Sequence, residues 1–124
     1  MRIGIDDLDK AVRDELEAYA AEVQESIDAA VVRVARRCLA QIRRNSPKKS
    51  GKYRKGWTMA TQKGRLSATA VIYNKTRYFL IHLLENGYQK ANGGRVNGTP
   101  HVEPAAEEAQ RELVEEITKS IKEL

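Results

Sequence analysis

A helical pattern of about forty residues is the feature that most limits how this chain can fold. From Ile5 to about Arg44 there is no proline and no glycine. Apolar or small residues recur there in steps of 3, 4 and 4, at Ile5, Leu8, Val12, Leu16, Tyr19, Val23, Ile27, Ala30, Val34 and Cys38. A period of eleven residues lies slightly above about 3.6 residues per turn, so the pattern predicts one long helix with a nearly straight or faintly right-handed apolar stripe.

The length of this helix raises a packing problem. Forty helical residues extend about 60 Å, whereas a compact domain of this size has a radius of gyration near about 14 Å. Either the helix breaks, for example around Ser26, and folds on itself within the monomer, or its N-terminal half packs on another subunit. We favour the second arrangement, which makes self-association a physical expectation.

The segment after the helix is predicted to form a small antiparallel sheet. Pro47 ends the helix because the residue before a proline is pushed out of the α region. Residues 53–62 are predicted to form a strand, with Trp57, Met59 and Thr61 on one face.

The return strand of this sheet is expected at Ser67 to Asn74, after a hairpin turn at 63–65. A two-stranded hairpin is marginal alone and needs a helix or a third strand. We expect the apolar turn 78–84 and the long helix to supply that cover.

The stretch 76–105 places one apolar segment on each side of a long polar loop. Its short helix stops at Glu85-Asn86-Gly87, because Asn and Gly both tolerate positive φ. Residues 88–99 have too little apolar content to order themselves, so we expect a flexible loop or an extended β-arm.

A last helix is predicted from Pro104 to about Lys122, with an apolar stripe at Ala105, Ala109, Leu113, Val114, Ile117 and Ile121.

Charge is segregated along the chain. Residues 1–28 carry nine acids and three bases, residues 29–84 carry fourteen bases and no acid, and residues 85–124 carry eight acids and five bases. A basic middle can bind phosphate, or it can join the acidic face of the next subunit, or the acidic helices can neutralise it within one monomer. We favour protein–protein contact over nucleic acid.

The residues that could carry catalysis are few, and they predict a non-enzymatic protein without cofactor or metal. His82 lies in an apolar helical turn, where a hydrogen-bonded structural histidine is the default. His101 and Glu103 lack a third and a fourth metal ligand, and Cys38 continues the apolar stripe of the long helix. The pair Gly93-Gly94 is expected to be a hinge or turn, because no Gly-Lys-Ser/Thr sequence follows it.

The sequence also predicts a soluble protein made in the cytoplasm. No run approaches the roughly eighteen apolar residues of a membrane span. The N-terminus turns acidic where a signal peptide has its apolar region. A single cysteine allows no internal disulfide.

Three runs of residues carry a family resemblance: Ser46-Pro47 with Gly51 and Tyr53, then His82-Leu83-Leu84-Glu85-Asn86-Gly87, then Pro100-His101-Val102-Glu103-Pro104-Ala105. Their order and spacing, over roughly the last two thirds of the chain, resemble the tail-component family of long-tailed bacteriophages. These are the small head–tail joining (neck or tail-completion) proteins of lambdoid siphophages. The resemblance implies a structural protein of a phage or prophage that forms a homo-oligomeric ring with other neck or tail proteins during virion assembly.

The sequence therefore predicts one α+β domain, located in the virion or, during assembly, in the host cytoplasm. Its parts are a long N-terminal helix (1–45), a basic loop with a β-hairpin (46–75), a short middle helix (76–87), a flexible loop (88–99) and a C-terminal helix (100–124). Candidate partner contacts are the bases of the two loops, Lys48, Lys49, Lys52, Arg54, Lys55, Lys90 and Arg95. Because Tyr53 and Trp57 lie among these bases, the alternative is a small basic nucleic-acid-binding protein, and a neck protein could also touch passing DNA.

Overall fold

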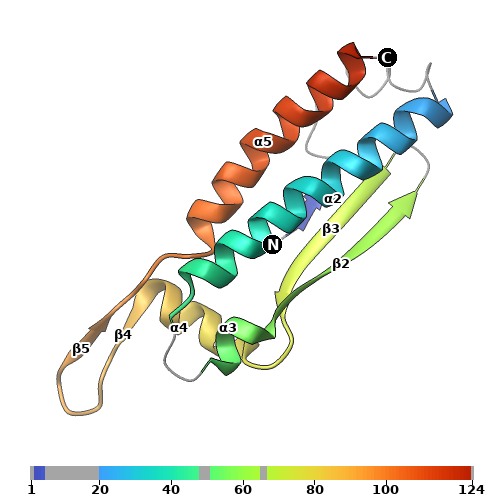
Figure 1. Ribbon diagram of the computed structural model, residues 1–124. Helices are drawn as coiled ribbons and strands as arrows, with labels where there is room; N and C mark the ends of the chain where they lie inside the picture. Colours follow the sequence, from blue (N-terminus) through green and yellow to red (C-terminus); the bar gives the residue numbers. More distant parts are fainter. Residues whose placement is uncertain (1, 5–19, 48–50, 65–66, 124) are drawn as a thin grey trace.

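A computed structural model gives the fold of the chain and describes residues 2–4, 20–47, 51–64 and 67–123 (Figure 1). The elements are β1 (Arg2–Gly4), α2 (Ala20–Asn45), α3 (Lys52–Gly56), β2 (Trp57–Gly64), β3 (Ser67–Asn74), the 3-10 helix η3 (Tyr78–Leu80), α4 (Ile81–Asn86), β4 (Gly87–Gln89), β5 (Arg95–Asn97) and α5 (Glu103–Lys122). The predicted α+β class is confirmed, with a long helix, a small antiparallel sheet, a short middle helix and a C-terminal helix.

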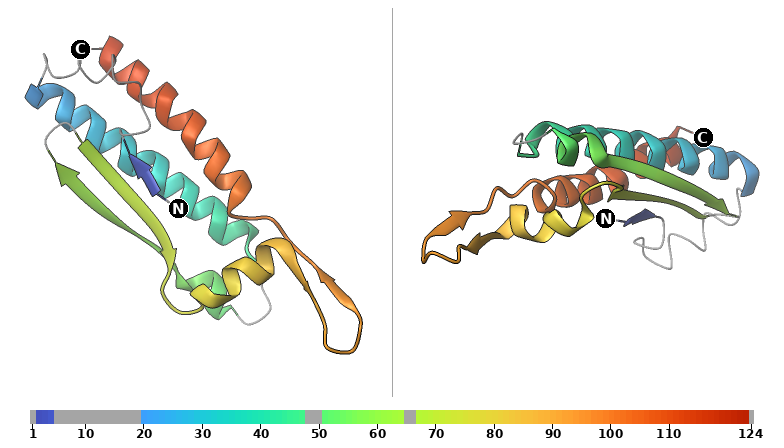
Figure 2. Two further views of the ribbon diagram at one scale, coloured as in Figure 1. Left: turned by 180° about the vertical axis from the view of Figure 1, so that it is seen from behind. Right: turned by 90° about the horizontal axis from the view of Figure 1, so that it is seen from below.

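Helix α2 is the centre of the fold, because α5 packs on one side of it and the sheet on another (Figures 1 and 2). The predicted stripe is confirmed where the structure describes it, since Val23, Ile27, Ala30, Val34 and Cys38 are all buried. Val31, Ala35 and Ile42 are buried as well. Two covering elements bury a wider surface of a helix than one does, which explains these extra positions.

The break proposed around Ser26 is wrong, because α2 runs unbroken through that residue. The chain itself covers the 26 residues of α2, so this part of the helix needs no second subunit to bury its stripe. The predicted helical residues 5–19 lie outside the described residues.

The main sheet has three strands in the order β1-β3-β2, all antiparallel. The predicted return strand is confirmed, since β3 runs from Ser67 to Asn74. Its residues alternate between the α2 side and the outside, with Ala68, Ala70 and Ile72 in the core. Strand β1, which sequence reasoning did not predict, is the third strand and pairs with the edge of β3.

The first strand of the hairpin begins later than predicted. Tyr53 to Gly56 belong to α3, and β2 starts at Trp57. Lys63 and Gly64, predicted as part of the turn, are paired strand residues, while Arg65 lies outside the described residues. The cause is tertiary: the side chain of Asn74 donates a 2.7 Å hydrogen bond to the carbonyl of Tyr53, which anchors α3 to the end of β3.

Strands β4 and β5 form a second hairpin that projects beyond the helices and the main sheet (Figures 1 and 2). We call residues 87–97 the arm. Of the two forms expected for this region, the structure has the extended β-arm. Its tip turns at Gly93, whose φ of +93° lies in the left-handed region that glycine favours.

Helix α5 confirms the predicted C-terminal helix and its stripe. Ala105, Ala109, Leu113 and Ile117 are buried against α2, whereas Val114 is exposed. Among the described helices, none combines the length and the apolar character that a membrane crossing requires.

Candidate functional site

The root of the arm is fixed by one carboxylate at the start of α5. Glu85, near the end of α4, accepts hydrogen bonds from three backbone N–H groups, those of His101 at 2.9 Å, Val102 at 3.0 Å and Glu103 at 2.9 Å. These are donors that the first turn of a helix cannot satisfy internally, and a negative charge there also suits the helix dipole. We call this contact the Glu85 clasp. It joins the two chain segments from which the arm emerges.

The clasp changes the acidity of Glu85. Burial alone would raise the pKa of its carboxyl group, but the hydrogen bonds from Glu103, His101 and Val102 outweigh that effect, so the pKa of Glu85 lies below its ordinary value. Glu85 is therefore ionised when the clasp is formed at neutral pH.

His101 connects the clasp to the core. Its ring is buried, and its Nδ1 lies 2.6 Å from the carbonyl oxygen of Thr99. Because a carbonyl only accepts, Nδ1 carries the proton, and Nε2 then accepts from the hydroxyl of Tyr53 at 2.5 Å. Burial raises the pKa of Tyr53, and the charge of Glu85 raises it further. The ring of Trp57 packs edge-on against both of these rings.

The two histidines therefore have roles that sequence alone did not separate. His82, expected inside an apolar turn, is exposed and its Nδ1 lies 3.2 Å from the side-chain amide of Asn86. His101 is the buried structural histidine. Glu103 is exposed and contributes its backbone N–H to the clasp.

An apolar surface lies beside the root of the arm, on η3, α4 and β4. Four large side chains are exposed there: Tyr78 by 71%, Phe79 by 59%, Leu83 by 38% and Tyr88 by 37%. We call them the aromatic patch. The opposite side of the same short helix packs on the core through Leu80, Ile81 and Leu84.

The aromatic patch was missed at the level of sequence, because residues 78–84 were expected to cover the hairpin as a whole. The spacing of the apolar residues nevertheless indicates such a surface. Phe79 and Leu83 are four residues apart, as are Leu80 and Leu84, so a short helix presents these pairs on different faces. A short helix that packs on one side only cannot bury both.

A second surface gathers positive charge where α2 ends. Arg43 and Arg44 of α2 line a cleft of about 450 Å³ together with Arg54 and Lys55 of α3. We call this the basic cleft. The predicted contact residues Arg54 and Lys55 thus meet two arginines that sequence reasoning had assigned only to the end of the helix. Lys52 is exposed on α3, and the predicted contacts Lys48 and Lys49 lie outside the described residues.

The other two predicted contacts, Lys90 and Arg95, are exposed on the arm and not in the basic cleft. A guanidinium nitrogen of Arg95 donates to the carbonyl of Asn86 at 3.3 Å, which directs this side chain along the arm toward its root. Both α3 and the arm lie at the end of the molecule where α2 terminates (Figures 1 and 2).

Ion pairs neutralise the middle of α2 within the chain. Arg33 pairs with Glu116 at 3.0 Å, and Arg37 pairs with Glu112 and Glu116 at 2.9 Å each. Hydrogen bonds to Glu116 and Glu112 raise the pKa of Arg37, and hydrogen bonds from Arg33 and Arg37 lower that of Glu116. One of the three predicted alternatives for the basic middle of the chain was neutralisation by acidic helices within the monomer. That alternative accounts for the positive charges of Arg33 and Arg37.

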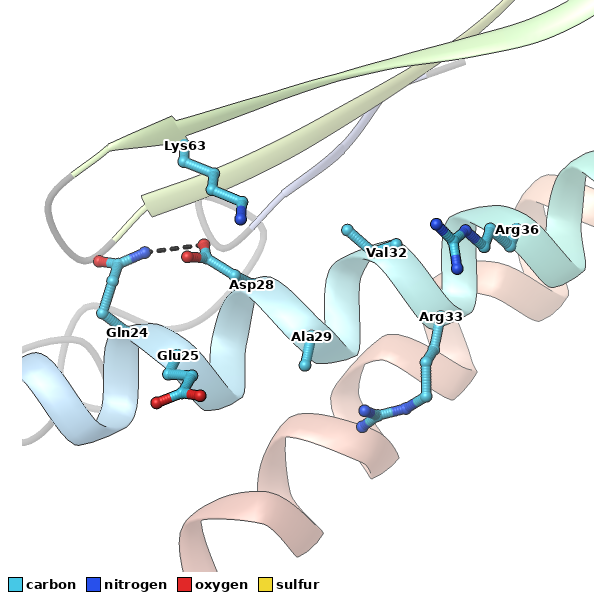
Figure 3. Close-up of a pocket in the computed structure, with 8 residues that line it drawn as sticks. All are labelled: Gln24, Glu25, Asp28, Ala29, Val32, Arg33, Arg36 and Lys63. Atoms are coloured by element: carbon cyan, nitrogen blue, oxygen red, sulfur yellow. Dashed lines mark hydrogen bonds between the residues drawn. The ribbon is translucent and has the colours of Figure 1, made fainter.

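A mixed-charge groove of about 550 Å³ runs along the N-terminal half of α2 (Figure 3). The side chain of Gln24 donates to Asp28 at 2.8 Å and to the carbonyl of Ser67 at 3.2 Å. Lys63 of β2 lies over the helix near Asp28, and Arg36 lies further along α2 (Figure 3). The groove therefore offers charges of both signs around a small apolar floor at Ala29 and Val32.

The cysteine of the chain is a core residue. Cys38 is buried beside the carbonyl of Ala105, and burial raises the pKa of its thiol to about 12, which disfavours a nucleophilic thiolate. Among the described residues, no three His, Cys, Asp or Glu side chains are placed to hold a metal ion.

Comparison with protein families gives one match, over residues 10–87, to the family described as "Bacteriophage HK97-gp10, putative tail-component". The match covers more than half of the chain and includes α2, the β2–β3 hairpin and α4. It differs in extent from the resemblance read from the motifs, because it takes in the long helix and stops before most of the arm and α5. Comparisons with curated proteins and with solved structures gave no match.

Proposed function

The chain belongs to the HK97-gp10-like family of bacteriophage tail components, and from this premise we propose that it is a structural subunit of the head–tail junction. It assembles there as a ring during virion assembly, and it acts by binding its neighbours and without catalysis. Nothing in the family match favours the alternative of a nucleic-acid-binding protein.

The single observation that carries the proposal is the aromatic patch at the root of the arm. Exposed Tyr78, Phe79, Leu83 and Tyr88 lie within eleven residues of sequence. Large aromatic side chains in contact surfaces supply much of the binding energy of protein interfaces, and a polar rim usually surrounds them. Here the arm and its charged residues Lys90 and Arg95 provide such a rim. The patch is therefore suited to dock on a neighbouring virion protein.

The arm supports the same proposal. Its two strands share only three residue pairs, and an isolated hairpin of this size is marginal in water. The Glu85 clasp fixes the root, while the tip carries exposed polar residues and few apolar ones. We propose that the arm gains order when it docks on an adjacent protein, as segments that fold on binding do.

The contact residues predicted from sequence keep their role as part of this proposal. Lys52, Arg54 and Lys55 would serve contacts at the α3 end, Lys90 and Arg95 contacts of the arm. Lys48 and Lys49 belong to the same basic stretch of sequence.

Complementation of a phage or prophage that lacks this gene tests the proposal. The double variant Phe79→Ser/Leu83→Ser removes the patch, and Val114→Ser removes an exposed apolar residue of α5 as the matched control. We expect the patch variant to yield separate heads and tails by electron microscopy, and the control to yield joined particles. Purified virions should contain the wild-type protein by mass spectrometry. Normal joined particles in the absence of the gene would overturn the proposal.

A further inference from the structure

We propose that copies of this chain join end to end through the basic cleft, which receives the carboxylates of Glu22 and Glu25 from the start of α2 in the next copy. The inference rests on the proposed ring and specifies the electrostatic contact that builds it.

The basic cleft gathers four positive charges. Among the described residues, none of Arg43, Arg44, Arg54 and Lys55 has a carboxylate partner, in contrast to Arg33 and Arg37. Arg33 and Arg37 have their partners on α5, at Glu112 and Glu116, whereas the segments that form the cleft contain no acid. Cations held together in one cleft repel one another unless an anion joins them.

Two guanidinium groups of the cleft, those of Arg43 and Arg54, are held in position by hydrogen bonds. Arg43 donates through Nε and a terminal nitrogen to the carbonyl of Trp57, at 3.1 and 2.5 Å. Arg54 donates to the carbonyls of Arg44 at 2.7 Å and Ser46 at 3.3 Å, and its Nε is buried without an acceptor. Side chains already fixed by such bonds lose little entropy when they bind a carboxylate.

The opposite end of α2 offers the matching charge. Glu22 and Glu25 are exposed and three residues apart, so they share one face of the helix. Together with Glu123 of α5 they line a groove of about 550 Å³ between the two helices. Among the described residues that line this groove, Arg33 is the one cation, and it is paired with Glu116.

Acids are also frequent in the sequence just before α2. Residues 5–19, which directly precede α2 in the chain, contain six acids and two bases. Glu22 and Glu25 at one end of α2 and the four cations of the cleft at the other are complementary in charge, which favours a second copy as the occupant of the basic cleft.

The positions of the two surfaces determine the kind of assembly. Residues 22–25 and 43–44 lie about 30 Å apart along α2, at about 1.5 Å per residue. A contact that joins two different surfaces of identical chains is heterologous, and it closes into a ring when the rotation between neighbours allows.

Charge reversal in the full-length chain tests the contact. Arg44→Glu/Lys55→Glu brings the charge of the basic cleft from +4 to 0, and Glu22→Lys/Glu25→Lys replaces the two acids at the start of α2 with cations. Arg36→Glu/Arg111→Glu is the matched control, because it reverses two exposed cations in the middle of α2 and α5 and changes the net charge equally. Assembly mass is measured by light scattering and native mass spectrometry at about 0.15 M salt.

We expect each end variant to weaken self-association on the order of 100-fold or more, because the first removes the net positive charge of the cleft and the second turns the attraction into repulsion. An equal mixture of the two end variants should assemble again, with alternating copies, and the control should assemble as the wild type does. End variants that assemble like the wild type, or a mixture that stays monomeric, would overturn the contact.

Other outcomes identify other occupants of the cleft. A closed dimer in place of larger assemblies would show antiparallel pairing and overturn the end-to-end contact. Binding of a short DNA duplex that Arg44→Glu/Lys55→Glu abolishes, with self-association unchanged, would assign the cleft to phosphate. Rings that survive both end variants refute the contact but leave the proposed junction ring intact. A wild type that is monomeric at all concentrations and absent from virions would refute both.

Discussion

The hydroxyl of Tyr53 lies 2.5 Å from Nε2 of His101, although 48 residues separate them in sequence. This bond ties α3, just after the basic loop, to the entrance of α5, where the Glu85 clasp also acts. The basic cleft and the root of the arm are thus positioned by one buried network.

Tyr53→Phe should destabilise the protein by about 1–3 kcal/mol, because Nε2 of the buried His101 then loses its donor. Urea denaturation followed by the fluorescence of Trp57 measures the change. Tyr73→Phe is the matched control, since Tyr73 is exposed and its hydroxyl is in contact with water. Equal stability of the two variants would contradict the assigned hydrogen bond.

Glu85→Gln should weaken the clasp and flatten the dependence of stability on pH. The folded state lowers the pKa of Glu85 from its ordinary value of 4.5, so the stability it contributes is present above that value and is lost as the pH falls through the lowered pKa. We expect the wild type to lose its advantage over Glu85→Gln as the pH falls below 4.5 and through the lowered pKa of Glu85. A constant difference across that range would show that ionisation of Glu85 does not stabilise the fold.

Hydrogen exchange gives a second measurement of the clasp. The backbone amides of His101, Val102 and Glu103 should exchange faster in Glu85→Gln, because an amide side chain offers one acceptor oxygen where the carboxylate offers two.

The local residue pattern was enough to predict the elements that have a clear apolar periodicity or a run of β-forming residues. The steps of 3 and 4 gave α2 and α5, and the run of β-formers gave β3 with its observed bounds. It failed at residues 53–56, because Asn74 and the buried contact with His101 hold Tyr53 in a helical turn. These partners are distant in sequence, so no local sequence pattern predicts their contacts with Tyr53.

The site was harder to predict than the fold for the same reason. The runs that contain Glu85 and His101 were recognised as motifs, but the carboxylate that caps α5 became visible only in three dimensions. Likewise Arg43 and Arg44 join Arg54 and Lys55 only because α3 folds back on the end of α2. The basic loop was predicted from charge alone, and charge does not report which cations share a cleft.

The thiol of Cys38 should react slowly with thiol reagents in the native protein. Burial raises its pKa to about 12, so the thiolate fraction at about pH 8 is on the order of one in ten thousand. Labelling should become fast in denaturant. Rapid native labelling, with the circular dichroism spectrum unchanged, would show that α2 and α5 separate readily at this position.

The two faces of the short middle helix should respond differently to truncation. Phe79→Ala removes an exposed ring and should change stability by less than about 0.5 kcal/mol. Leu84→Ala removes a side chain packed against the core and should cost about 1–3 kcal/mol. Thermal unfolding compares them, and a large loss for Phe79→Ala would assign the patch a structural role in place of a binding one.

The ion pairs between Arg37 of α2 and Glu116 of α5 should contribute little to stability, despite their short distances. Both side chains are partly exposed, so solvent screens the attraction, and such pairs contribute about 0.2–1 kcal/mol. A double-mutant cycle with Arg37→Ala and Glu116→Ala isolates their coupling energy from the other contacts of each residue. The coupling should fall when salt is raised from about 0.1 M to about 1 M, because the screening length then shrinks to about 3 Å. A coupling energy that is large and independent of salt would show instead that the pair is shielded from solvent and that α5 is held on α2 by charge as much as by its apolar stripe.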